Sequence, residues 1–156
     1  MAAEYSYSLV QTVAANGSVI FNESSVIGDN RIYHRDGSGI FRLASPRLLG
    51  AKRNKCCCKE PRAIYRVSYG GNIAIPTGGT VGEIGLAVFI DGEEDPSGVM
   101  LFTPAAVEEF GNVSVDVLVE VPWICGCSSV SVRNISTEPI LVQNSNIVIG
   151  FDRVVY

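Results

Sequence analysis

Alternation of apolar and polar residues dominates the chain. In the clearest run, 113–121, every odd-numbered position is a valine. Similar alternation occurs at 63–69, where Tyr65 and Tyr69 share one face, and again at 129–134. Because successive side chains of a strand point to opposite faces, this pattern predicts half-buried β-strands.

Short apolar runs bounded by turn residues predict further strands. We expect them at 9–13, 19–21, 40–44, 83–90, 99–103, 140–144 and 146–154, and 72–76 continues the strand of 63–69. Asn16-Gly17 separates the first two runs and predicts a tight hairpin, since a type I′ turn needs positive φ at both central residues. Gly70-Gly71 predicts a bulge in a strand. Only 104–110 has a helix-like pattern, of two turns at most.

These patterns amount to about eight to ten strands with turn signals at short intervals. No helix-sized crossover separates them, which argues against a parallel α/β sheet. The prediction is therefore one all-β domain over 1–156, an antiparallel sandwich or jelly roll. Its least regular part is a long loop at 45–61, which holds five of the twelve lysines and arginines and three consecutive cysteines.

Composition agrees with a compact chain. Of the 156 residues 47% are hydrophobic and only 18% are charged, which excludes intrinsic disorder and leaves few charges to cover a free surface. The net charge of −4 disfavours broad attraction to nucleic acid. The longest strongly apolar run, 86–90, is far shorter than the roughly 20 residues that span a bilayer. Residues 1–6 show no export signal, so an extracellular location would need a carrier such as a virion.

Cysteines offer the most distinctive chemistry. An odd number of cysteines, in a chain that shows no export signal, argues against a complete disulfide framework. Their thiolates could bind zinc or an iron–sulfur cluster, but consecutive cysteines on a strand point to opposite sides and the spacing matches no known finger. Free thiols are the favoured state, with disulfides or a zinc site as alternatives. The candidates are Cys56, Cys57, Cys58, Cys125 and Cys127.

Other reactive residues are sparse. His34 is the single histidine, and its place in the 34–39 turn cluster indicates a surface residue rather than a catalytic base. Two acidic groups could hold calcium, but they lack the dense spacing of a calcium loop, and we read them as solvated turns. They are Glu93, Glu94 and Asp95, and Glu108 and Glu109. Trp123, next to Pro122, is a candidate ligand contact. We therefore expect that the protein is not an enzyme and that it binds no cofactor.

A family resemblance emerges when several segments are taken in order. Gly39-Ile40-Phe41-Arg42-Leu43, then 65–69, then 86–92, followed by closing strands from 130, resemble the jelly rolls of the complement and tumour-necrosis-factor superfamily. More narrowly, 72–80 and 103–109 are similar to uncharacterised proteins of gut Firmicutes and their phages. Those proteins resemble the C-terminal domain of collagen-like exosporium glycoproteins. The resemblance covers about 9–156.

The resemblance implies ten-stranded protomers that form a homotrimer and serve structure or ligand binding. A Gly-X-Y collagen stalk is missing from the sequence. We therefore expect a phage virion protein, such as a head decoration, head fibre or tail-tip adhesin. Its partners would be its own copies and other virion proteins, or a cell-surface glycan or receptor. The alternative is a lectin-like or cytokine-like head on a bacterial cell or spore surface.

One question stays open in the sequence. The apolar faces of 113–119 and 147–151 could lie in the core of one protomer or along the axis of a trimer.

Overall fold

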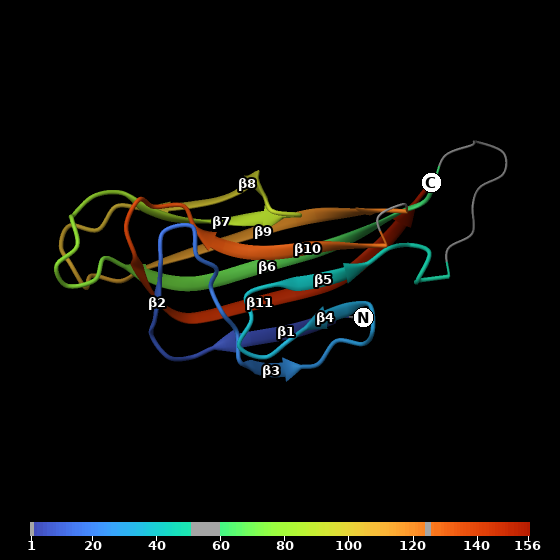
Figure 1. Cartoon of the computed structure of the whole chain (residues 1–156), viewed down its shortest axis with the longest axis horizontal. Helices are drawn as coiled ribbons and strands as arrows, with labels where there is room; N and C mark the ends of the chain where they lie inside the picture. The colour runs from blue at the N-terminus through green and yellow to red at the C-terminus, as the bar shows by residue number, and fades with distance from the viewer. Residues whose placement is uncertain (1, 51–59, 124–125) are drawn as a thin grey trace.

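The computed structural model describes residues 2–50, 60–123 and 126–156, which form two antiparallel sheets packed face to face (Figure 1). The first sheet contains, in spatial order, β3 (Glu23–Val26), β1 (Ala2–Tyr7), β11 (Ile140–Val155), β6 (Arg62–Ala74) and β9 (Gly111–Pro122), with β2 (Gln11–Val13) paired to β11. The second contains β4 (Ile32–His34), β5 (Phe41–Ala44), β10 (Cys127–Asn134), β7 (Ile84–Ile90) and β8 (Glu93–Phe102). We call them the six-stranded and the five-stranded sheet. No segment of the described chain is a helix that could cross a membrane.

The hydrophobic core fills the space between the two sheets. Tyr65, Phe21 and Phe41 are among its largest fully buried side chains. The alternating faces predicted in the sequence point inward, because the valines of 113–121 are buried apart from half-buried Val115. Ile147 and Ile149 are also fully buried. These apolar faces therefore lie mainly in the core of one protomer and not along the axis of a trimer.

The hairpin predicted at Asn16-Gly17 is wrong, although the turn exists. Asn16 has φ 61°, and the Gly17 amide donates a 2.8 Å hydrogen bond to the carbonyl of Ala14. The flanking segments do not pair with each other. β2 pairs with β11, whereas the Val19 amide donates to the Val132 carbonyl of β10. The turn therefore carries the chain from one sheet to the other.

The irregularity predicted at Gly70-Gly71 is present, but the extra residue lies on the neighbouring strand. β6 continues through both glycines, and the register with β11 shifts within 143–146. A Cβ on Gly71 would lie 2.7 Å from the Tyr69 hydroxyl. Glycine is therefore needed for that hydroxyl to sit 3.2 Å from the Ser145 hydroxyl, with which it is hydrogen bonded.

The helix predicted at 104–110 is also wrong. This segment connects β8 to β9 as an irregular loop whose side chains are mostly exposed. Glu108 has φ 57°, in the left-handed region that interrupts a helix, and its amide donates to the carbonyl of Ile75. A tertiary hydrogen bond thus replaces the helical ones.

Candidate functional site

The outer surface of β4 and β5 carries the most distinctive group of side chains in the described structure. Tyr33 on β4 stands opposite Arg42 on β5. Both point outward because the alternate positions Ile32, Phe41 and Leu43 are buried in the core. We define the Tyr33 face as Tyr33, Arg35, Ser38, Ile40 and Arg42, which together line one hollow.

The turn between β4 and β5 holds Arg35 in a defined place. The Ser38 amide donates to the Arg35 carbonyl at 3.0 Å, with Gly37 at φ 78°. Phe21 fixes the same turn from below. Its carbonyl accepts from the Gly37 amide at 2.8 Å, and its amide donates to the Ser38 carbonyl at 3.2 Å. The turn is therefore tied to a fully buried core residue.

His34 ends β4 and packs half-buried against the aromatic core, so it is not the surface turn residue predicted from the sequence. Its ring stacks on Phe41 at 4.4 Å between centroids and lies 4.8 Å from the ring of Tyr5. Its Nε2 donates to the Ser38 carbonyl at 2.9 Å, since a carbonyl can only accept. The buried Nδ1 has no hydrogen-bond partner. The imidazole therefore supports the turn of the Tyr33 face.

The hollow of the Tyr33 face has a volume of about 290 Å³. This is near the lower limit of small-ligand pockets, so it suits one unit of a larger ligand. Tyr33 is 59% exposed and Ile40 is 46% exposed, so the hollow offers apolar surface beside its two arginines.

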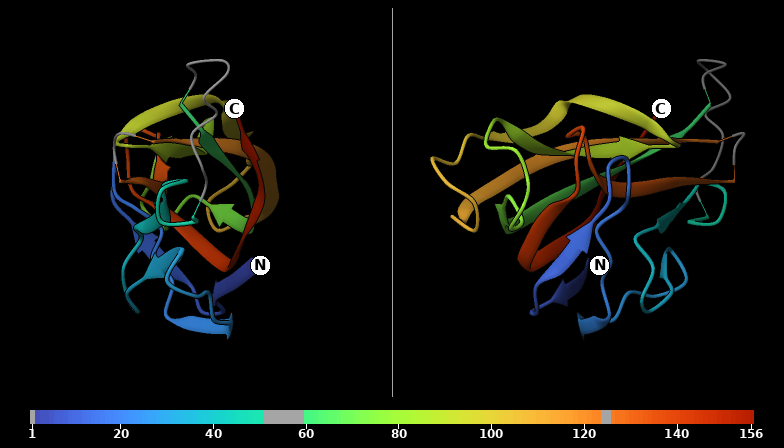
Figure 2. Two further views of the ribbon diagram at one scale, coloured as in Figure 1. Left: turned by 90° about the vertical axis from the view of Figure 1, so that its right-hand side faces the viewer. Right: turned by 60° about the vertical axis from the view of Figure 1, so that its left-hand side comes forward.

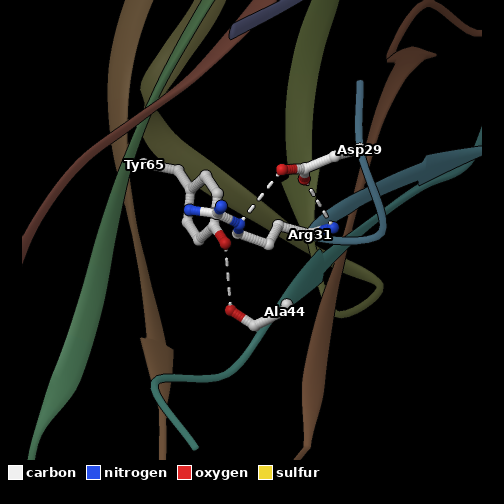
Figure 3. Close-up of polar contacts among 4 residues, drawn as sticks. All are labelled: Asp29, Arg31, Ala44 and Tyr65. Atoms are coloured by element: carbon white, nitrogen blue, oxygen red, sulfur yellow. Dashed lines mark hydrogen bonds and ion pairs between the residues drawn. The ribbon is translucent and has the colours of Figure 1, made fainter. Parts of the chain in front are cut away.

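Arg35 and Arg42 form no ion pair with any described carboxylate, in contrast to nearby Arg31. Arg31 bonds to Asp29 through both its Nε, at 3.1 Å, and its amide, at 2.9 Å. Figure 3 shows this pair beside the buried Tyr65, whose hydroxyl donates to a β5 carbonyl. The same hairpin region thus contains one neutralised arginine and two unneutralised ones.

Two neighbouring features extend the Tyr33 face. On the other side of Tyr33 lies a second hollow of about 430 Å³, lined among others by Asp29, Asn30 and Asp36. Along β10, Arg133 packs over the ring of Phe89 at 4.8 Å. Arg133 also forms no ion pair with the described carboxylates. Tyr33 therefore lines both the hollow of the two unpaired arginines and a hollow with aspartate and amide side chains.

The predicted cysteine site lies mostly beyond the described residues. Cys127 begins β10 and is an exposed free thiol, whereas 56–58 and Cys125 fall outside the described ranges. The described flanks of the two cysteine segments do meet. The Ser45 amide donates to the Gly126 carbonyl at 3.0 Å. Within the described chain, no three histidine, cysteine, aspartate or glutamate side chains converge as a metal site.

The remaining predicted site residues are dispersed. Residues 93–95 are not a turn but the beginning of the edge strand β8, and Asp95 accepts from the amide of Ser97. Glu108 accepts a 2.7 Å hydrogen bond from the Thr77 hydroxyl. Trp123 directly follows β9 and is half-buried, and its role as a ligand contact stays a prediction.

Sequence reasoning missed the Tyr33 face because it assigned 34–39 to a turn and started the next strand at 40. The alternation Ile32-Tyr33-His34-Arg35 was an available signal, since it places Tyr33 and Arg35 on one face of a strand. The register that sets Tyr33 opposite Arg42 was not visible in the sequence.

Comparisons with known proteins define the fold but not a family. No protein-family model matches the chain, and no curated protein matches its sequence. Its structure is similar to the globular domain of zebrafish complement 1qA protein, with a TM-score of 0.55 and 11% identity over 95% of this chain and 92% of that one. It is also similar to murine APRIL (TM-score 0.50, 9% identity, 95% and 98% covered). A third similar structure is the PRD1 vertex protein P5 (TM-score 0.50, 14% identity, 97% and 96% covered).

These similarities confirm the predicted fold class, an all-β antiparallel jelly roll. At such low identities they describe the fold alone. The protein is thus a jelly-roll module with an exposed, cationic and aromatic face on its five-stranded sheet.

Proposed function

We propose that the chain is a non-enzymatic structural and binding module that assembles as a homotrimer on a phage virion. The family resemblance of the sequence and the likeness in fold to the PRD1 vertex protein P5 support the virion assignment. The packing of His34 supports a role other than catalysis, because the only histidine is half-buried and stacks on Phe41. The candidate role on the virion is head decoration, head fibre or tail-tip adhesin.

The observation that supports the trimer is a set of exposed apolar side chains on the two edge strands at one side of the sandwich and in the connection between them. β8 and β9 are the edge strands of the two sheets on this side, and β3 and β4 form the opposite side (Figures 1 and 2). Leu101 and Leu118, on β8 and β9, are 55% and 50% exposed. Val107 and Phe110, in the connection between them, are 37% exposed each. Exposed apolar side chains on neighbouring edge strands favour burial against another protomer.

Molar mass in solution tests the assembly. Light scattering of the purified chain, with reductant present, should give about three times the 16.7 kDa mass of one chain. The double variant Leu101→Glu/Leu118→Glu should give monomers, because association would bury its new charges. Leu48→Glu is the matched control, since Leu48 is 68% exposed and lies in the segment after β5, outside β8, β9 and their connection. Circular dichroism verifies that each variant folds. A monomeric parent chain, or a trimeric double variant, would contradict the proposal.

The virion assignment needs a separate experiment. Antibodies against the purified chain should label phage particles produced by the strain that encodes it, and mass spectrometry of washed particles should detect the chain. The alternative function, a lectin-like head on a bacterial cell or spore surface, is favoured by the Tyr33 face. Labelling of cells or spores without particles would support that alternative and overturn the virion role.

A further inference from the structure

We propose that the Tyr33 face is a binding site for an acidic saccharide. Arg35 and Arg42 bind the carboxylate of one sugar unit, and Tyr33 packs against the face of its ring. This inference rests on the binding role in the proposed function and names the site and the class of ligand.

Charge is the first argument. Arg35 and Arg42 line the same hollow of about 290 Å³, and no carboxylate of the described residues lies within ion-pair distance of either. Two guanidinium groups in one hollow repel each other, and an anion between them removes that repulsion. The planar guanidinium also binds carboxylates through two parallel hydrogen bonds, which gives a carboxylate an advantage over a halide.

The apolar surface in the same hollow favours a sugar over a small inorganic anion. The ring of Tyr33 and the side chain of Ile40 are both well exposed there, and this apolar surface would contribute nothing to holding a bare phosphate or sulfate. A sugar ring presents C–H groups on its face and hydroxyls at its rim, so it can cover the tyrosine ring while its acid group meets the arginines. The Ser38 hydroxyl, whose oxygen already accepts from the Ile40 amide, can donate to a rim oxygen.

The surroundings of the hollow suit a polymer better than a free sugar. The hollow is open at the surface, and the second hollow, with Asp29, Asn30 and Asp36, begins on the other side of Tyr33. Acidic and amide side chains accept hydrogen bonds from neutral sugar hydroxyls. A chain crossing Tyr33 could therefore place an acidic unit on the basic side and a neutral unit on the acidic side.

The site is also held in shape before any ligand arrives. The turn that carries Arg35 is fixed by two backbone hydrogen bonds to Phe21 and by the His34 imidazole. A site on a fixed turn loses less conformational entropy on binding than one on a free loop.

Binding to defined polysaccharides tests the proposal. Biolayer interferometry of the full chain would use immobilised polygalacturonate and polysialic acid as carboxylated probes and fully methyl-esterified pectin as the neutral one. At least one carboxylated probe should bind, with affinity that falls as salt rises. The neutral probe should not bind. Absence of binding to both carboxylated probes, or equal binding to the neutral one, would overturn the proposal.

Variants locate the binding on the molecule. Arg35→Gln and Arg42→Gln should each weaken binding by about tenfold or more, because each removes a charge-assisted hydrogen bond. Tyr33→Ala should weaken it as well, and Tyr33→Phe should keep the affinity, since ring packing needs no hydroxyl. Arg66→Gln, on the outer surface of the six-stranded sheet, is the matched control and should bind like the parent chain.

A polyanion control separates sugar recognition from charge alone. Inorganic polyphosphate should bind more weakly than the carboxylated saccharide and should be insensitive to Tyr33→Ala. If polyphosphate binds as tightly as the saccharide, the site is a general anion surface and the sugar class is wrong. The experiments also test the binding site and the trimer independently. A monomer that binds polygalacturonate would refute only the trimer. A trimer that binds no acidic saccharide would refute only the site.

Discussion

The arginines on the two outer surfaces of the sandwich differ in whether they pair with carboxylates. On the six-stranded sheet, Arg66 bonds to Asp116 at 2.6 Å, and Asp116 also accepts from the Ser68 hydroxyl at 2.9 Å. Arg62 and Glu120 form a second pair, at 3.3 Å. On the five-stranded sheet, Arg35 and Arg42 have no described carboxylate as a partner.

This difference distinguishes charges that hold strands together from charges that remain free to bind a partner. The paired side chains join β6 to β9, so each pair supports the strand order of its own sheet. The unpaired arginines support no strand contact of this kind, yet they lie on strands and turns that the core holds firmly. A surface of fixed, unneutralised charge is suited to a partner from outside the chain. The comparison therefore assigns stability to the charges of the six-stranded sheet and ligand binding to the unpaired arginines of the five-stranded sheet.

The largest expected effect comes from the inner face of the six-stranded sheet. β6 of the six-stranded sheet contributes two buried tyrosines, Tyr65 and Tyr69. Burial raises the pKa of each to about 12, although the positive charge of Arg31 opposes the shift at Tyr65 and the hydrogen bond with Ser145 opposes it at Tyr69. In the unfolded chain both would titrate near 10.

Alkaline pH should therefore destabilise the fold. Between pH 10 and 12 the unfolded state loses these protons and the folded state keeps them, so the free energy of unfolding falls as pH rises. Each tyrosine contributes a loss of roughly 2 to 3 kcal/mol over this window. Urea unfolding at pH 9, 10, 11 and 12 measures it. Tyr65→Phe and Tyr69→Phe should each remove about half of the pH dependence. Constant stability up to pH 12 would show that neither hydroxyl is as buried as the structure indicates.

The second effect concerns the junction between the two sheets. Asn134, at the end of β10, is fully buried, and its amide group donates to the carbonyls of Val13, Ala14 and Glu138 at 2.9–3.3 Å. Its side-chain oxygen accepts from the Ser136 amide at 2.8 Å. Because Val13 belongs to β2, this one side chain joins the five-stranded sheet to the six-stranded one.

Asn134→Asp should cost about 3 kcal/mol or more of unfolding free energy, because it buries a charge against three carbonyl oxygens. Thermal and urea unfolding at pH 7 measure the loss. Asn112→Asp is the matched control, since Asn112 is an exposed residue whose amide donates to Gly71 at 3.4 Å and to Asn72 at 3.2 Å, and the change should alter stability little. Equal stability of the two variants would mean that Asn134 does not join the sheets.

The sequence revealed the strands whose alternation is long, and it missed those that depend on distant partners. Residues 113–121 form β9 as expected, because period-two alternation determines both strand and face. β4 was missed although its residues alternate, because a run as short as Ile32–His34 is hard to distinguish from the turn that follows it. β1 was missed because its edge of the sheet is defined by pairing with distant β11. The turn at Asn16-Gly17 was found but its role was not, since local φ preferences cannot tell a hairpin from a crossover.

The candidate site was less predictable than the fold for the same reason. Tyr33, Arg35 and Arg42 come together only through the register of β4 with β5 and the anchoring of their turn to Phe21. His34 was visible as the single histidine, but its burial depends on Tyr5 and Phe41, which other strands supply.

The smallest expected effect tests the opening comparison directly. Asp116→Asn removes the charge that pairs with Arg66 and should lower the free energy of unfolding by about 0.5 kcal/mol, as for other exposed ion pairs. Arg42→Gln should leave stability unchanged or raise it slightly, because it removes repulsion from Arg35 and breaks no pair. Urea unfolding at low salt and in about 1 M salt measures both variants, and the difference between them should vanish at high salt as charges are screened. If Arg42→Gln costs as much stability as Asp116→Asn, Arg42 has a structural partner, and the division between a stabilising surface and a binding surface is wrong.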